Sequence, residues 1–216
     1  MNDLIYQRTE IMLGDITKLK NSHVCICGIG GVGSYAVEAL ARIGIGMISI
    51  IDKDIVDITN INRQIIALHS TVGLDKVKVQ MDRIKDINPN TKVNSIKVEL
   101  NEDNIGNYIT TDMDYVVDCV DNVEAKVGLI KFCNNNSIKL ISCMGMAKKV
   151  NPLDIKVEDI YNTKMCPLAK IIRKRLKSLN ILKQKVVFSV ESPIVTDGNI
   201  LRECVICSVC CRSCYC

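Results

Sequence analysis

The sequence has no apolar run approaching the roughly 20 residues that cross a membrane. Its N-terminus has no apolar segment of the signal-peptide kind, so we expect a cytoplasmic protein without a membrane span. The two histidines, His23 and His69, lie at no ligand spacing and are expected to be structural. The 216 residues, 48% apolar and 24% charged, suffice for one globular domain with a sizeable core. A net charge of +4 is too small by itself to indicate a nucleic acid partner.

Cysteine, in contrast, is abundant, with twelve residues. Without a leader segment we interpret these cysteines as reduced thiols or metal ligands rather than as disulfides. Half of them lie between Cys204 and Cys216, where the pairs Cys204/Cys207 and Cys211/Cys214 are closer together than in a typical zinc knuckle.

The chain is organised around a glycine-rich turn between two apolar runs. Residues 24–27 are typical of a buried strand, residues 35–43 carry apolar side chains at helical spacing, and residues 47–51 form a second run that ends at Asp52. This order is typical of dinucleotide-binding folds, in which the helix N-terminus faces a phosphate and an acid holds the ribose. The loop alone does not choose between NAD, FAD and ATP.

Periodicity and breakers predict the remaining elements. Helices are expected over residues 76–87, 101–110, 123–134 and 167–182, and strands over residues 91–100, 115–120, 139–143 and 154–157. The alternation predicts an α/β protein with a doubly wound, Rossmann-like sheet, parallel in its N-terminal part and with an antiparallel C-terminal portion. Residues 1–22 are expected to form a helical arm that lies over the fold.

Three motifs follow one another in the first third of the chain: Gly28-Ile29-Gly30-Gly31-Val32-Gly33, Asp52-Lys53-Asp54 and Thr59-Asn60-Ile61-Asn62-Arg63-Gln64. Their order resembles the ATP-dependent adenylating enzymes of the ubiquitin-activating-enzyme-like family (ThiF, MoeB and HesA). Such enzymes join a carboxylate to the α-phosphate of ATP and expel pyrophosphate, which requires cations around the phosphates. The resemblance implies ATP and Mg²⁺ as cofactors and residues 23–200 as the adenylating domain.

The resemblance also implies roles for single residues. Arg63 and Asn60 would contact phosphate, as would Lys76. Asp121, just past a buried strand, would hold magnesium, and Met144 to Ala147 would line the acyl site. Arg8 would act as an arginine finger on the ATP of the partner subunit in a homodimer. The catalytic candidates are Arg8, Arg63, Lys76 and Asp121, and the other nucleotide-contact candidates are Gly28, Gly30, Gly31, Gly33, Ser34, Asp52, Asp54, Asn60, Asn62, Gln64 and Asn122.

Residues 164–185 contain lysines and arginines but no acid. The helix expected there is either a solvated face or a surface that follows nucleic acid phosphates. Together with Asp86-Ile87-Asn88-Pro89, Arg175-Leu176-Lys177 and Phe188-Ser189-Val190-Glu191-Ser192-Pro193, this segment is similar to the tRNA threonylcarbamoyladenosine dehydratase branch of the family. That branch implies a tRNA substrate whose threonyl carboxylate is adenylated and then attacked internally, with net loss of water. Sulfur-transfer proteins are further candidate partners.

The tail departs from this likeness. One allowed set of codons for residues 204–216, moved by one base, encodes Val-Ser-Phe-Val-Pro-Ser-Val-Ala-Gly-Leu-Ala-Ile, which resembles how the dehydratases continue. We therefore hypothesise that a frameshift near Leu201 produced an aberrant segment 201–216. The fold would then lack its last strand and a terminal helix. A native zinc site is the alternative interpretation.

Other functions remain open. Adenylation of a ubiquitin-like sulfur-carrier protein would use the same motifs, but one Cys-x-x-Cys zinc pair of those relatives is missing, with only Cys166 in its region. An NAD-binding oxidoreductase would use the glycine loop and would not need Arg63, Lys76 or Asp121. A non-catalytic nucleotide-binding scaffold is the third alternative.

Overall fold

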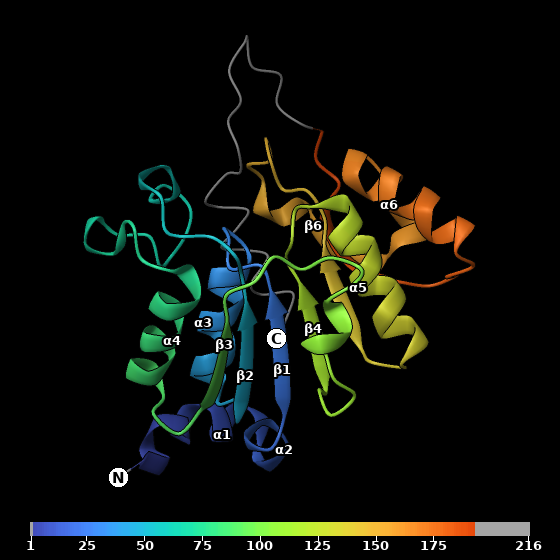
Figure 1. The fold of residues 1–216 in the computed structure, drawn as a ribbon. Helices are drawn as coiled ribbons and strands as arrows, with labels where there is room; N and C mark the ends of the chain where they lie inside the picture. The colour runs from blue at the N-terminus through green and yellow to red at the C-terminus, as the bar shows by residue number, and fades with distance from the viewer. Residues whose placement is uncertain (1, 193–216) are drawn as a thin grey trace.

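Seven strands form one sheet in the described part of the chain, residues 2–192 of the computed structural model (Figure 1). In spatial order they are β3 (Lys92–Ile96), β2 (Met47–Ile51), β1 (His23–Cys27), β4 (Tyr115–Asp118), β5 (Leu140–Cys143), β7 (Lys185–Ser189) and β6 (Ile155–Asp159). Neighbouring strands are parallel except β6 and β7, which are antiparallel. The predicted doubly wound sheet with an antiparallel C-terminal portion is confirmed. Residues 201–216, to which the frameshift hypothesis applies, lie outside the described residues.

Helices cover both faces of the sheet. Since consecutive residues of a strand point to opposite faces, each strand contributes side chains to the core on both sides. Val24 and Ile26 of β1 belong to an apolar cluster with residues of α3 (Gly33–Ile43) and α4 (Lys76–Ile87). Cys25 and Cys27 belong to a second cluster with residues of α5 (Val123–Asn135) and α6 (Pro167–Ser178). β1 is therefore buried along its whole length, which accounts for its continuous apolar run. Among residues 2–192, no helix has both the length and the apolar character to span a membrane.

Some predicted elements differ from the structure. The helix over residues 101–110 is wrong: the Asn101 side chain accepts backbone N–H groups two and three residues on, and only a 3-10 turn, Ile105–Asn107, follows. The strand over residues 91–100 is confined to β3, the part that pairs with β2. The helix over residues 167–182 ends at Ser178, because Asn180 has a left-handed backbone with φ of 56°. β7 was not predicted.

The N-terminal arm comprises a 3-10 helix (Asn2–Tyr6), α1 (Gln7–Leu13) and α2 (Thr17–Lys20). Tyr6 fixes it to the body, since its buried hydroxyl accepts a hydrogen bond from Asn88 Nδ2 at 2.7 Å. α1 itself has no buried residue and lies at the amino ends of the strands (Figure 1). The expectation of a helix lying over the fold is therefore wrong for α1.

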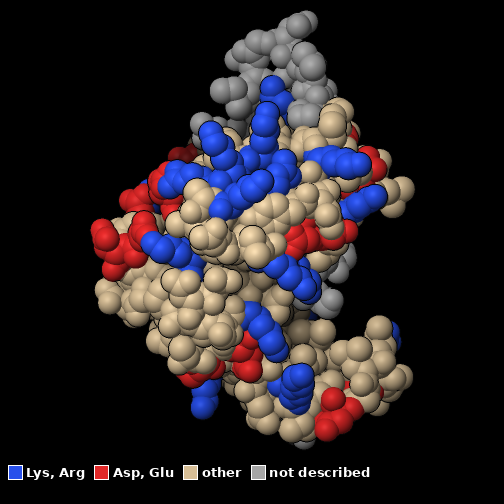
Figure 2. Space-filling model, turned by 90° about the vertical axis from the view of Figure 1, so that its right-hand side faces the viewer, with Lys and Arg blue, Asp and Glu red and all other residues tan. Residues whose placement is uncertain are grey.

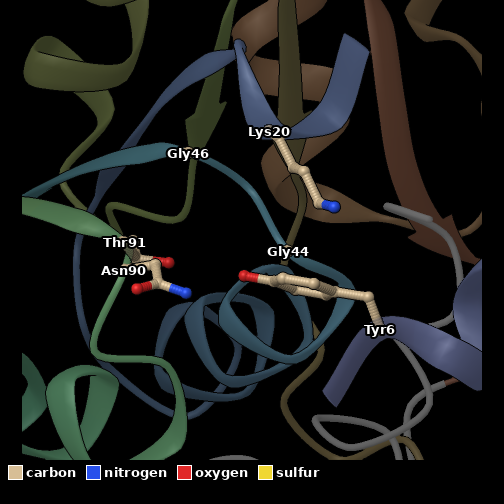
Figure 3. A pocket seen from close by; sticks show the side chains of 6 residues that line it. All are labelled: Tyr6, Lys20, Gly44, Gly46, Asn90 and Thr91. Carbon is tan, nitrogen blue, oxygen red and sulfur yellow. The ribbon is translucent and has the colours of Figure 1, made fainter. Parts of the chain in front are cut away.

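A small pocket of about 180 Å³ lies where the arm meets the body (Figure 3). Tyr6 and Lys20 line it from the arm, with Lys20 Nζ 4.6 Å from the centre of the Tyr6 ring, and Asn90 and Thr91 line it from the body. Gly44 has φ of +99°, and a Cβ there would lie 2.6 Å from the Tyr6 ring. The pocket is therefore the joint between arm and body.

Candidate nucleotide-binding cleft

A cleft of about 980 Å³ opens at the carboxyl ends of β1, β2, β4 and β5. β1 has β2 on one side and β4 on the other, so the strand order reverses here, and open α/β sheets bind ligands at such a point. Most of the predicted nucleotide-contact residues line this cleft: Gly28, Gly30, Gly31, Asp52, Asp54, Asn60, Asn62, Arg63, Gln64, Lys76, Asp121 and Asn122. The structure thus brings together candidates that lie up to about ninety residues apart in the sequence.

Asp52 holds the glycine loop against the end of β2. One carboxylate oxygen accepts a hydrogen bond from the Ile29 N–H at 2.5 Å, and the other accepts one from the Asp54 N–H at 2.8 Å. Burial raises the pKa of Asp52, while the Lys76 ammonium and these two N–H groups oppose the rise. Asp52 therefore shapes the loop, a role that its place in the sequence does not indicate.

Lys76, the first residue of α4, is 5% exposed and lines the cleft. Its Nζ donates a hydrogen bond to Asp54 Oδ2 at 2.8 Å, and the Asp54 side chain is half exposed. An unpaired ammonium at this depth would be costly, so the carboxylate compensates it. Lys76 therefore places a cation in the cleft. Its partner in this structure is a carboxylate, which is negatively charged as a phosphate is.

The turn at residues 57–64 presents a cation and a buried acceptor. Asn60 Oδ1 accepts a hydrogen bond from the Asp57 N–H at 3.1 Å, which closes the turn. Arg63 Nη1 donates to two oxygens of this turn, at 2.9 and 3.1 Å. Gln64 Oε1 is buried and accepts no hydrogen bond from residues 2–192. A buried acceptor without a donor in a cleft is satisfied by a ligand or by water.

Asp121 and Asn122 follow β4 on the other side of the glycine loop. Asn122 Oδ1 accepts a hydrogen bond from the Ala125 N–H at 3.0 Å and so caps α5, a structural role beside the predicted nucleotide contact. The exposed Asp121 lines the cleft. Beneath this loop the fully buried Asp118 forms an ion pair with Lys126, at 2.8 Å between Oδ2 and Nζ.

Three candidates are not among the described residues that line the cleft. Gly33 lies behind the loop, where a Cβ would come within 1.8 Å of the Gly28 carbonyl oxygen, so it lets α3 pack on the loop. Ser34 is buried, and its Oγ accepts a hydrogen bond from the Ile65 N–H at 3.4 Å. Arg8 is exposed on α1, at the opposite end of the sheet (Figure 1).

Other residues of the cleft were not predicted. Val98 and Leu100, after β3, contribute apolar surface near the nucleotide-contact residues, as do Val120 and Ala125. A sequence signal existed, because residues just past a strand end of a doubly wound sheet face the ligand crevice. Leu168 of α6 lines the cleft together with Met144, Gly145 and Ala147, which were expected at the acyl site.

Among the described cysteines, five are buried free thiols: Cys25, Cys27, Cys133, Cys143 and Cys166. Burial raises the pKa of Cys133 to about 12. The pKa of Cys27 is also raised, by its contact with Cys25, at 4.0 Å between the sulfur atoms, and by burial. Such thiols stay protonated and behave as core residues. Cys119 and Cys143 are the cysteines in this part of the chain that line the cleft.

The sequence profile of the ThiF family matches residues 6–178. This chain belongs to the ThiF family. The ThiF-family chain is 44% identical over 201 residues to the tRNA threonylcarbamoyladenosine dehydratase of Bacillus subtilis (strain 168), a match that covers 92% of this chain and 79% of that protein. Its fold matches the crystal structure of E. coli tRNA N6-threonylcarbamoyladenosine dehydratase, TcdA, in complex with AMP, with a TM-score of 0.94 and 35% identity over 98% of this chain and 90% of that one. The TcdA complex with ATP matches with a TM-score of 0.92 and 36% identity over the same shares.

Proposed function

We propose that this chain is an ATP-dependent dehydratase that converts threonylcarbamoyladenosine in tRNA to its cyclic form through an acyl-adenylate. One observation carries the proposal. A single cleft contains the glycine loop, Arg63 and Lys76 as well as the loop Met144–Ala147, so it has room for a nucleotide beside an acyl group. The chain is 44% identical to the dehydratase of B. subtilis, and the E. coli dehydratase TcdA has the same fold.

The chemistry consists of two displacements. A carboxylate oxygen of the substrate attacks the α-phosphorus of ATP, and pyrophosphate leaves. A nucleophile within the threonylcarbamoyl group then attacks the acyl carbon, and AMP leaves with that oxygen, so that the substrate loses one water overall. Arg63 and Lys76 are proposed to stabilise charge on the phosphates, while the loop positions the acyl group so that ring closure is intramolecular.

Magnesium is the proposed metal, with Asp121 as its protein ligand. Among residues 2–192, no group of three or more His, Cys, Asp or Glu side chains could hold a metal by itself. This fits magnesium, which commonly binds one or two carboxylates together with substrate phosphates and water. When bound, the ion would neutralise charge on the phosphates during adenylation.

The proposed tRNA surface is the exposed face of α6. Figure 2 shows lysine and arginine side chains gathered on the side of the molecule where α6 lies. The exposed residues Lys170, Lys174 and Lys177 are the proposed phosphate contacts. Leu168, in the first turn of the same helix, lines the cleft, so tRNA bound along α6 would lie next to the acyl site.

Two arginines of this helix have partners within the fold. Arg173 Nη1 donates to the Thr163 carbonyl at 3.0 Å and to its hydroxyl at 2.8 Å, and Arg175 pairs with Glu124 at 2.5 Å. Arg173 therefore connects α6 to the segment before it. We assign tRNA contacts to the lysines rather than to Arg173.

We propose a homodimer in which the arm of one subunit covers the other. Leu4, Ile11 and Met12 of the arm are 70%, 77% and 81% exposed. A second group of exposed apolar residues follows β2, and the first of them lines the cleft: Ile55, Ile58, Leu68, Val72 and Leu74. Contact between the two groups would bury both. It would also carry Arg8, which lies far from its own cleft, toward the cleft of the partner.

The comparisons do not favour the alternative functions. Residues 2–192 contain no Cys-x-x-Cys pair, and sulfur-transfer partners remain a prediction. A cytoplasmic location is part of the proposal, because tRNA is the proposed substrate.

The proposed reaction is tested by mass spectrometry of nucleosides from tRNA incubated with the protein, ATP and magnesium. We expect threonylcarbamoyladenosine to lose one water, and Arg63→Ala or Asp121→Ala to abolish this loss. Wild-type protein that leaves the nucleoside unchanged, in a reaction where B. subtilis dehydratase converts it, would refute the proposal.

The dimer is tested by mixing inactive variants. Arg8→Ala and Asp121→Ala subunits would each be inactive alone, but a mixed dimer would contain one intact site. After subunit exchange we expect up to about a quarter of the wild-type activity, since half the dimers are mixed and each has one working site. A mixture with no activity would show that Arg8 does not act across the dimer.

A further inference from the structure

Lys126, near the start of α5, is fully buried. Its Nζ donates hydrogen bonds to Asp118 Oδ2 at 2.8 Å, to the Cys143 carbonyl at 2.9 Å and to Ser142 Oγ at 3.3 Å. The Ser142 hydroxyl also donates to Asp118 Oδ2. An ammonium has three hydrogens, so its donors are fully satisfied.

The partners of Lys126 come from the ends of two neighbouring strands, and each end leads into the cleft. Asp118 ends β4, and its Oδ1 accepts a hydrogen bond from the Val120 N–H at 3.1 Å, one residue before Asp121. Ser142 and Cys143 end β5, and Met144 follows directly. The ammonium therefore connects the loop that carries Asp121 to the loop that begins at Met144. Lys126 itself is not among the described residues that line the cleft.

A contribution to stability does not by itself account for such a pair. Taking two charges out of water is costly, and well-packed apolar replacements of buried ion pairs are often neutral or stabilising. What a fully satisfied buried network does supply is one fixed arrangement of the segments that it joins. Here those segments are the two sides of the cleft between which the acyl group and the α-phosphate would meet.

We propose that Lys126 is a positioning residue for adenylate formation. It fixes the Asp121 loop relative to the loop at Met144 and does not touch ATP. The inference rests on the proposed function. Removing Lys126 is expected to lower kcat by about 10–100-fold, the effect of small misplacements of reacting groups. The KM for ATP is expected to stay within about twofold, because the glycine loop, Arg63 and Lys76 are not part of this network.

The decisive variant is the double substitution Lys126→Met with Asp118→Asn, which removes both charges and keeps similar side-chain volumes, so that no unpaired buried charge opposes folding. Lys131→Met is the matched control: it removes another lysine of α5, which is 43% exposed and pairs with Glu102 at 2.7 Å. kcat and the KM for ATP are measured in the dehydration assay, with thermal unfolding as the check on folding. Backbone hydrogen exchange of residues 119–122 and 143–146 supplies a readout that needs no turnover.

A folded double variant with reduced kcat, unchanged KM for ATP and faster exchange in both loops supports the proposal, provided that Lys131→Met behaves as wild type. A folded double variant with wild-type kcat, or with unchanged exchange in both loops, overturns it. Where the double variant does not fold, Ser142→Ala, which removes one hydroxyl and no charge, decides by the same measurements. An inactive wild type refutes the proposed function, while the exchange data still test whether Lys126 orders the two loops.

Discussion

Replacement of Gly33 by alanine should damage the cleft without touching a ligand. The new Cβ would lie 1.8 Å from the Gly28 carbonyl oxygen and 3.3 Å from Cys119 Cβ. Cβ atoms essentially never approach other heavy atoms closer than 3.0 Å, so the glycine loop or α3 must shift by about 1 Å. Overpacking of this size costs about 1–3 kcal/mol. In a domain of this length, each kcal/mol corresponds to about 2–4 °C in Tm, so we expect Tm to fall by about 2–12 °C.

Thermal unfolding without ATP measures the loss of stability, and unfolding with ATP measures the loss of nucleotide binding. ATP at a hundred times its Kd should stabilise the wild type by about 2.7 kcal/mol, and a displaced loop should remove most of that gain. Gly30→Ala is the control, because a Cβ there has no heavy atom within 4 Å, so its Tm without ATP should equal that of the wild type. A Gly33→Ala protein with wild-type Tm and the full ATP-induced rise would refute the steric argument.

Three further predictions follow from charged side chains. Burial raises the pKa of Glu38, but its two arginine partners outweigh burial and hold the pKa below 4.5. The stability that these ion pairs give is present above pH 4.5 and is lost as the pH falls through the lowered pKa. In urea unfolding, Glu38→Gln should lose this dependence of stability on pH. Lys76→Met should lower ATP-dependent turnover at least about 100-fold, whereas Lys78→Met, at an exposed pair on the same helix, should leave turnover unchanged. Lys174→Ala should weaken tRNA binding in a filter-binding assay and reduce the slope of log K against log salt concentration by about one, without changing Tm. Arg173→Ala, in contrast, should lower Tm in thermal unfolding.

The elements that could be predicted have local signals. α4 was predicted at its observed bounds, because Lys76 follows a glycine turn and Asn88-Pro89 stops the helix. The glycine loop and β1 were also evident, since an uninterrupted apolar run directly before a glycine motif is typical of the first strand of a nucleotide-binding fold. The helix predicted over residues 101–110 failed because side-chain capping by Asn101 competes with helix propagation, which composition alone does not reveal.

The parts of the site that could not be predicted depend on pairing across the chain. Asp118 and Lys126 are visible in the sequence, but only the adjacency of β4 and β5 shows that Ser142 and Cys143 complete their network. Similarly, an exposed charge and a buried one look the same in a sequence, so the structural role of Arg173 appeared only with its contacts to Thr163.

The strand order has a consequence for how the chain folds during its synthesis. β1 is made before the other described strands, but one of its two neighbours, β4, ends at Asp118, and the cleft takes its last described residue from α6. Pairing between segments this distant is slow, because the long loop between them must close before their contacts form. During synthesis, β1 must wait for more than ninety further residues before its second edge is covered. The nascent chain therefore completes its cleft, and with it any stabilisation by ATP, only after α6 has been made.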